Sequence, residues 1–209
     1  MDNKSIVGRQ AELDGIRNGL SPSGSAKGFL FVGEEGIGKT TILEESWRTL
    51  SSSPTPIIWI TPNLSAAKDE LGAASSLARG IDTSSSELRS VLSAFARTFG
   101  QKVFEIQRES TKNVSSGDST VGAQLAENWS SRFLEILSES KASGIHNPLV
   151  VLAIDDVNKL SDKVTGWFVE DFLPKWKESG IAEQTRYLFT AEVKPDGQSL
   201  ELISSACDG

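Results

Sequence analysis

The residues Gly33-Glu34-Glu35-Gly36-Ile37-Gly38-Lys39-Thr40 have the spacing G-x-x-x-x-G-K-T. Backbone N–H groups in such a glycine-rich turn form a concavity of positive potential, and a helix that begins there adds its positive dipole end. This arrangement fits a phosphate chain. We therefore predict that this segment, with Lys39 on the β- and γ-phosphates and the Thr40 hydroxyl on Mg²⁺, binds a nucleotide. The predicted contact residues are Gly33, Gly36, Ile37, Gly38, Lys39, Thr40 and Thr41. The alternative is a glycine turn without a ligand.

A pair of acidic residues, Asp155 and Asp156, directly follows the apolar run Leu149–Ile154. A continuously apolar run of this length is typical of a strand covered on both faces in a parallel sheet. A carboxylate at the end of that strand can hold Mg²⁺, so Asp155 is predicted to share the ion with Thr40. Asp156 is predicted to orient the attacking water, which makes Lys39, Asp155 and Asp156 the candidate catalytic residues. The alternative is a helix cap and turn.

Strands and helices alternate around these two motifs. Apolar spacing predicts a helix that begins near Arg9, a strand at Phe29–Val32 before the glycine turn, and a helix over Lys39–Leu50 after it. Further strands are expected at Ile57–Thr61, between prolines, and at Tyr187–Thr190. This alternation implies an α/β domain with right-handed crossovers.

The segment from residue 63 to residue 148 shows helical patterns and no strand pattern. Three helices are expected, around Leu71–Leu77, Leu88–Val103 and Leu125–Leu137. Residues 110–122 are rich in Ser, Thr, Gly and Asn, which predicts a mobile loop. We interpret the whole segment as a helical insertion.

Taken together, these motifs resemble the P-loop ATPases of the AAA+ and STAND group. The segment Ile6-Val7-Gly8-Arg9-Gln10-Ala11-Glu12-Leu13 is similar to the Val-Gly-Arg-x-x-Glu-Leu box of STAND and origin-recognition-like ATPases, and Leu149–Val157 is similar to their Walker B strand. The resemblance implies that Val7, Gly8 and Arg9 lie against the adenine. For Arg9 the alternative is a pair with Glu12 at the start of a helix.

The resemblance also implies a three-layer αβα sandwich with a parallel sheet of order 5-1-4-3-2. The Tyr187–Thr190 strand would then lie between the strands that carry Gly33 and Asp155. The chain ends at Gly209, and we expect a domain without the fifth strand and the lid, either as a piece of a longer protein or as a reduced version whose remaining wall comes from a partner. Where the STAND pattern has an arginine that senses the γ-phosphate, only Thr190 is available, so hydrolysis is expected to be slow or to need a partner.

The composition and charge of the chain argue against several kinds of binding partner. The 209 residues carry a net charge of −7, so no global positive field attracts nucleic acid or anionic lipid, and no apolar stretch is long enough for a membrane span. The single cysteine, Cys207, and the lack of a signal peptide favour a cytoplasmic protein. His146 has no second ligand at metal-binding spacing and is interpreted as a loop residue. The five tryptophans are predicted to pack in the core rather than stack on bases.

These inferences favour a domain that binds Mg-ATP and hydrolyses it to ADP, acting as a conformational switch in a larger signalling, regulatory or defence protein. ATP is preferred over GTP because no guanine-reading Asn-Lys-x-Asp run is present. Further domains, protein partners or a homo-oligomer are expected. An arginine of the inserted helices could then serve a neighbouring subunit, the candidates being Arg79, Arg89, Arg97, Arg108 and Arg132. The alternatives are an AAA+ ATPase that loads or remodels DNA and a non-hydrolysing interaction module.

Overall fold

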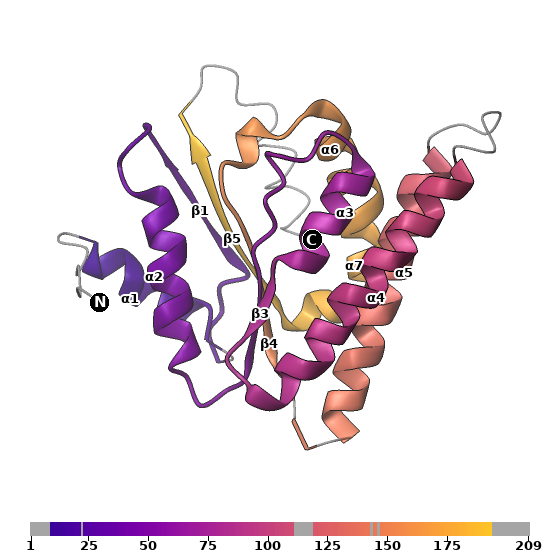
Figure 1. Cartoon of the computed structure of the whole chain (residues 1–209). Coiled ribbons are helices and arrows are strands. Elements are labelled where there is room, and N and C mark those ends of the chain that lie inside the picture. Colours follow the sequence, from indigo (N-terminus) through magenta and orange to yellow (C-terminus); the bar gives the residue numbers. More distant parts are fainter. Residues whose placement is uncertain (1–8, 22, 111–118, 143, 146, 194–209) are drawn as a thin grey trace.

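Five strands form one sheet, which runs through the middle of the molecule (Figure 1). The computed structural model describes residues 9–193 apart from residues 22, 111–118, 143 and 146. The strands are β1 (Gly28–Gly33), β2 (Ile57–Ile60), β3 (Ile81–Thr83), β4 (Leu149–Ile154) and β5 (Thr185–Glu192). Their order across the sheet is β1-β5-β4-β2-β3, and every pair is parallel except β2 with β3.

This order confirms the predicted arrangement of the four parallel strands. The last strand in sequence, β5, pairs with both β1 and β4, so the carboxyl ends of the strands that carry Gly33 and Asp155 lie on either side of it. In the register, Gly33 lies opposite Glu192 and Ile154 lies opposite Phe189. The glycine turn and the acidic pair therefore meet at the carboxyl ends of the parallel strands, which we call the carboxyl edge of the sheet. Residues 194–209 lie outside the described residues.

The short strand β3 corrects the expectation that residues 63–148 hold no strand. It pairs antiparallel with β2 at the edge of the sheet, with Ile81 opposite Ile60 and Thr83 opposite Ile58. Its sequence is Ile-Asp-Thr, which is too short to show an alternating pattern. The backbone of β2 supplies the pairing, so the strand depends on a neighbour that is distant in sequence.

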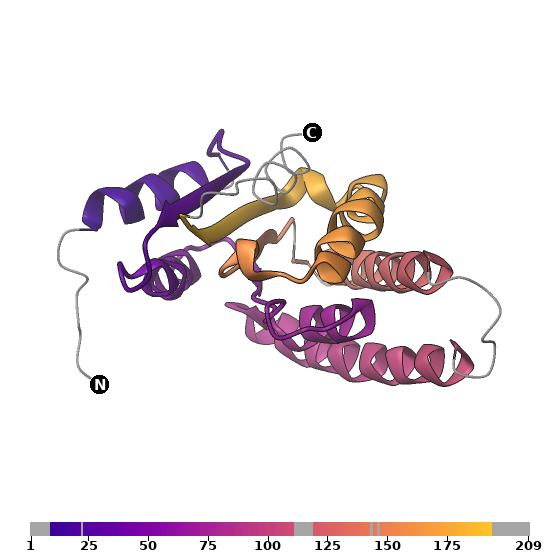
Figure 2. The same cartoon turned by 90° about the horizontal axis from the view of Figure 1, so that it is seen from above.

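Helices cover both faces of the sheet (Figure 2). One face packs on α1 and α2, and the other on α3 through α7. The helices are α1 (Gln10–Gly19), α2 (Lys39–Ser51), α3 (Glu70–Arg79), α4 (Ser86–Ser110), α5 (Ser119–Ala142), η1 (Val157–Lys159), α6 (Asp162–Gly166), η2 (Trp167–Phe172), α7 (Leu173–Glu178) and η3 (Ile181–Gln184). Along β4, Val151 packs toward α1 and α2 while Val150 and Leu152 pack toward the other helices, as the twofold period of a strand requires. The three-layer αβα sandwich is confirmed.

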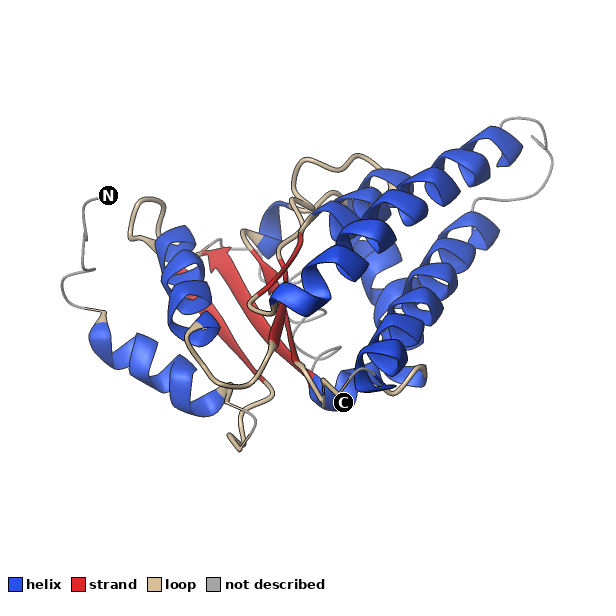
Figure 3. Cartoon of the chain, turned by 60° about the horizontal axis from the view of Figure 1, so that its bottom comes forward, coloured by secondary structure: helices blue, strands red, loops and turns tan. Residues whose placement is uncertain are grey.

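The insertion contains the three expected helices, and the two long ones, α4 and α5, lie side by side (Figure 3). The predicted loop at residues 110–122 is wrong at its carboxyl end, because α5 begins at Ser119. The polar sequence there reads as a loop, yet Gly122 lets α5 approach η2 closely, and the indole N–H of Trp167 donates to the Gly122 carbonyl at 2.9 Å. Residues 111–118 lie outside the described residues.

The tryptophans pack as the sequence predicts. Trp59, Trp129, Trp167 and Trp176 are buried, and Trp47 is half-buried against Trp59, with 5.6 Å between ring centroids. His146 lies outside the described residues. Within the described part of the chain, no helix has both the length and the apolar character that a membrane crossing needs.

Candidate functional site

The turn between β1 and α2 is shaped by its glycines. Gly36 and Gly38 have φ angles of 80° and 89°, in the left-handed region that glycine adopts without strain. At Gly33, a Cβ atom would lie 2.0 Å from Cδ1 of Ile37. The loop therefore closes over its own first residue, and no larger residue fits at that position without movement.

The amino end of α2 is left uncapped by this turn. Gly38 occupies the N-cap position, where it offers no side chain, and the first turn of the helix has no acidic residue. The first N–H groups of a helix have no partner within it and carry the positive end of its dipole. Thr40 and Thr41 are exposed at this end. The helix start thus offers N–H donors to an anion.

Lys39 adds a positive charge to the same place. Its Nζ donates to the carbonyl oxygens of Gly33, at 2.9 Å, and Glu34, at 2.8 Å. The residue is only 9% exposed, and no carboxylate of the described residues forms an ion pair with it. A buried ammonium that has only neutral partners favours an anion beside it.

Asp155 lies at the carboxyl end of β4, facing the start of α2. The Thr40 hydroxyl donates to Asp155 Oδ2 at 2.6 Å, and the Thr190 hydroxyl donates to Oδ1. A hydroxyl and a carboxylate oxygen from two elements therefore converge, and these are ligands that Mg²⁺ prefers. In the described residues no three or more His, Cys, Asp or Glu side chains gather as a metal site. The donor set fits an ion that takes its other ligands from phosphates and water.

Asp156 is held more tightly than the sequence suggested. Its φ and ψ are 51° and 50°, a left-handed conformation that is uncommon outside glycine and that concentrates at functional sites. Its N–H donates to the Thr190 hydroxyl at 2.9 Å, and its Oδ2 accepts from Lys159 Nζ at 2.8 Å. The carboxylate that was predicted to orient water is therefore engaged in an ion pair in this structure.

Thr190 lies between the two aspartates. It is fully buried on β5, and its hydroxyl donates to the Asp155 carboxylate while it accepts from the Asp156 backbone. Through these two contacts, Thr190 joins β5 to the Asp155 carboxylate and to the Asp156 backbone. Its hydroxyl fixes the direction in which Asp155 points.

Arg9 makes both the contact expected from its helix position and a contact with the glycine turn. Its Nη1 is 3.0 Å from Glu12 Oε1, and its Nη2 donates to the Ile37 carbonyl at 3.1 Å. The pKa of Glu12 is lowered first by a backbone hydrogen bond to its carboxylate and next by the hydrogen bond from Arg9. Arg9 therefore ties the start of α1 to the glycine turn. Val7 and Gly8 lie outside the described residues.

Sequence reasoning missed three residues at this edge: Asn158, Lys159 and Glu192. Lys159 Nζ lies 2.6 Å from Glu192 Oε1 as well as contacting Asp156, and the Asn158 side-chain oxygen accepts from the Glu192 N–H at 2.9 Å. The hydrogen bonds that the Lys159 ammonium donates to Asp156 and Glu192 raise the pKa of Lys159, which keeps it charged. The one sequence signal was the spacing of three between Asp156 and Lys159. Glu192 is too distant in sequence to be found that way.

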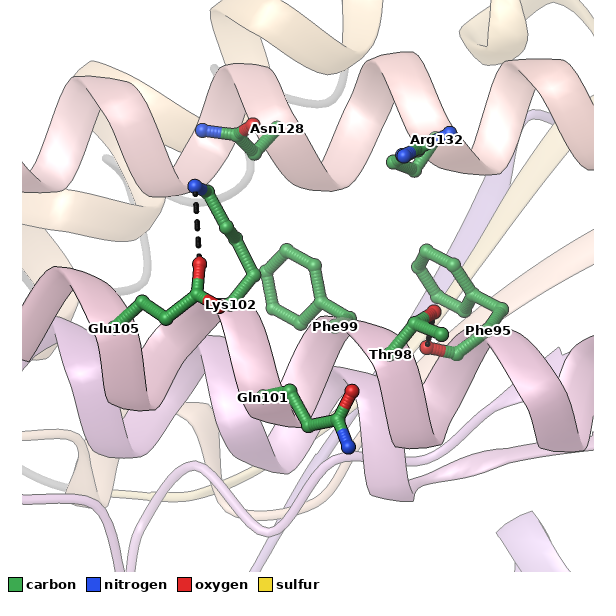
Figure 4. A pocket seen from close by; sticks show the side chains of 8 residues that line it. All are labelled: Phe95, Thr98, Phe99, Gln101, Lys102, Glu105, Asn128 and Arg132. Atoms are coloured by element: carbon green, nitrogen blue, oxygen red, sulfur yellow. Dashed lines mark hydrogen bonds and ion pairs between the residues drawn. The ribbon is translucent and has the colours of Figure 1, made fainter.

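Two hollows of the described structure differ in whether they include these residues. An open groove of about 730 Å³ begins at Thr40 and Asp155 and continues along α2 to Trp47 and the end of β2. A smaller hollow of about 380 Å³ lies between α4 and α5, with Phe95 and Phe99 beside Lys102 and Arg132 (Figure 4). Only the first reaches the residues described above.

The family and the fold of this chain are found in known proteins. A family model described as an AAA ATPase domain matches residues 5–172, which include the glycine turn and the acidic pair. The crystal structure of Cdc6p from Pyrobaculum aerophilum has a TM-score of 0.54 and 15% identity, covering 98% of this chain and 44% of that one. This chain thus spans less than half of that protein, and the likeness concerns the fold. No curated protein matches the sequence.

Proposed function

Since this chain belongs to the AAA ATPase domain family, we propose that it binds Mg-ATP, hydrolyses it to ADP, and changes conformation with its nucleotide state. The observation that carries the proposal is the buried Lys39 ammonium, which has only carbonyl partners and lies at the uncapped start of α2. Directly opposite, Thr40 and Asp155 are in contact. The cation, the N–H donors and the proposed metal ligands therefore share one small region.

Each residue has a separate task in this reaction. The N–H groups of Gly36 to Thr41 and the Lys39 ammonium bind the phosphate chain, and Lys39 exchanges its carbonyl partners for phosphate oxygens. Thr40 and Asp155 would hold Mg²⁺, which when bound supplies charge neutralisation to the phosphates. Asp156 orients the attacking water and accepts its proton. Phosphoryl transfer needs mainly positioning and electrostatics, which this set provides.

The proposed switch depends on how the site joins the sheet. Asp155 and Asp156 are both bonded to Thr190 on β5, and β5 pairs with the strand that leads into the glycine turn. A change at the phosphates therefore acts on β1, β4 and β5 together. We propose that this coupling serves a larger signalling, regulatory or defence protein of the STAND type, in the cytoplasm, through further domains, protein partners or self-association.

The test is steady-state ATP turnover with and without Mg²⁺. Wild type is expected to release phosphate only with Mg²⁺, and Lys39→Ala and Asp155→Ala are each expected to lose at least about a hundredfold in kcat/KM, a loss of ~3 kcal/mol. Lys163→Ala, which removes an exposed lysine of α6 that forms no ion pair within the described structure, is the matched control and should keep full turnover. Binding of ATP and ADP with equal affinity and no turnover would instead support the non-hydrolysing module.

A further inference from the structure

At the carboxyl ends of β4 and β5, one lysine is shared by two carboxylates. We propose that Lys159 is a positioning residue that responds to the γ-phosphate: it restrains Asp156 in an ion pair when no triphosphate is bound, and moves its ammonium to the γ-phosphate when one is. This move frees the Asp156 carboxylate to orient water. The inference rests on the proposed function and adds a regulatory residue to that same site.

The contacts define the restrained state. Lys159 Nζ lies 2.8 Å from Asp156 Oδ2 and 2.6 Å from Glu192 Oε1. The side chain of Lys159 is 38% exposed, against 26% for Asp156 and 18% for Glu192. The lysine is therefore the member of the trio with the most freedom to reorient, and its flexible four-carbon stem suits that movement.

In contrast, the two residues that carry the carboxylates have backbone N–H groups that are hydrogen-bonded to neighbouring side chains. The Asp156 backbone is in the left-handed region, with its N–H on the Thr190 hydroxyl, and the Glu192 N–H donates to the Asn158 side chain. Asn158 thus ties the end of β5 to η1, which is the turn that also carries Lys159. A cation on a long, partly exposed side chain, between two acids whose backbone N–H groups are bonded, can exchange partners without a rearrangement of the sheet.

The trio lies beside the predicted phosphate position. Glu192 is in register with Gly33, and the Gly33 carbonyl accepts from both Val193 N–H, at 3.3 Å, and Lys39 Nζ, at 2.9 Å. The end of β5 therefore abuts the carbonyl that holds the phosphate-binding lysine. On its other side, Asp156 directly follows Asp155, which contacts Thr40. Through its contact with Asp156, Lys159 therefore lies next to the residues that are proposed to hold Mg²⁺.

Charge explains why a triphosphate would matter. Two carboxylates share one ammonium, so the trio has a net charge of −1, and Asp155 adds a further negative charge next to it. A γ-phosphate brought close to Asp156 would be repelled unless a cation lies between them. Lysine is a common phosphate ligand that acts as a point charge. A diphosphate lacks the competing group, so ADP should leave the Lys159–Asp156 pair intact.

The test is calorimetric titration with Mg-ADP and with the Mg²⁺ complex of a non-hydrolysable ATP analogue. Lys159→Gln is expected to bind the analogue about tenfold more weakly and ADP within twofold of wild type. Lys159→Arg, which keeps the charge, should retain most of the discrimination. Glu192→Gln, which removes one competitor for the ammonium, should bind the analogue severalfold more tightly, again with little change for ADP. Lys163→Gln is the charge-matched control and should bind both ligands as wild type does.

The outcomes separate this inference from the proposed function. If wild type binds neither nucleotide, both fail. If wild type binds both and Lys159→Gln binds both equally well, or loses both equally, Lys159 is not a γ-phosphate-responsive residue and the proposed function stands. If Lys159→Gln does not fold, Glu192→Gln decides: tighter binding of the analogue alone supports the inference, and equal shifts for both ligands overturn it.

Discussion

The carboxyl edge of the sheet and the helical layer beside it are built from different interactions. At the edge, Lys39, Asp155, Asp156 and Lys159 are held by hydrogen bonds and ion pairs. In the helical layer, aromatic rings from α4, α5, η2 and α7 contact one another, with centroids 4.8 Å apart between Trp129 and Phe133 and 5.1 Å apart between Trp129 and Trp176. The residues proposed to bind nucleotide are therefore separate from those that form the aromatic core, so we expect that each set can be changed while the other is kept.

The largest expected effect is in the helical layer. Trp129 is fully buried and contacts the rings of Phe95, Phe133, Phe172 and Trp176. Trp129→Ala should lower the free energy of unfolding by about 3–5 kcal/mol, because it leaves a large cavity. Urea denaturation measures this. The control is Phe104→Ala on α4, where the residue is 64% exposed and the change should be within about 0.5 kcal/mol. Equal losses of unfolding free energy in the two variants would contradict the role of the buried Trp129 ring in the stability of the helical layer.

Lys39→Met is expected to weaken nucleotide binding strongly while changing the free energy of unfolding little. Loss of the ammonium should weaken Mg-ATP binding by about 3 kcal/mol, roughly a hundredfold, since charge-assisted contacts to phosphate are lost. The free energy of unfolding should change by less than about 1 kcal/mol, because the partners of Lys39 in this structure are neutral carbonyls. Titration of the nucleotide and urea denaturation of the same sample check both halves. If Lys39→Met lowered the free energy of unfolding as much as Trp129→Ala does, Lys39 would be needed for folding as well as for binding.

Two glycines in the long helices should respond with opposite signs. At Gly122 in α5, a Cβ atom would lie 2.6 Å from Asp171 Oδ2 and 2.9 Å from Trp167 Cδ1, so Gly122→Ala should destabilise the fold by about 1–3 kcal/mol. At Gly100 in α4, nothing lies within 4 Å, and Gly100→Ala should stabilise it by about 0.5–1 kcal/mol through helix propensity. The midpoints of thermal unfolding of the two variants, compared with wild type, test these opposite signs. Stabilisation by both would show that α5 does not approach η2 so closely.

The smallest effect concerns Asp171, the carboxylate beside Gly122. Burial, with the nearby charges of Glu170 and Glu70, raises the pKa of Asp171 above its usual value. The folded state then binds this proton more tightly than the unfolded state, so stability falls as pH rises from the unfolded pKa, about 3.9, through the raised folded pKa. Asp171→Asn should remove that part of the decline and stabilise the fold slightly at neutral pH. Urea midpoints at several pH values measure it, and an unchanged pH profile would contradict the cause.

The sequence predicted the edge better than the helical layer, for a physical reason. The residues from Gly33 to Thr40 act through their backbone and spacing, so eight consecutive letters define their geometry. The apolar period also predicted α4 and α5, but which aromatic rings meet is decided by packing between elements. The strand β3 and the Lys159–Glu192 pair were missed for the same reason, since each depends on a partner distant in sequence.

In the proposed function, backbone amides at the start of α2 bind the phosphates of Mg-ATP. Amide hydrogen exchange, with and without Mg-ATP, reports on those groups directly. We expect exchange in the peptide that contains Gly36 to Thr41 to slow on addition of Mg-ATP, while exchange in the α4 peptide that contains the exposed Phe104 is unchanged. Unaltered exchange in that peptide at saturating Mg-ATP, in protein with native unfolding behaviour, would contradict phosphate binding by these amides.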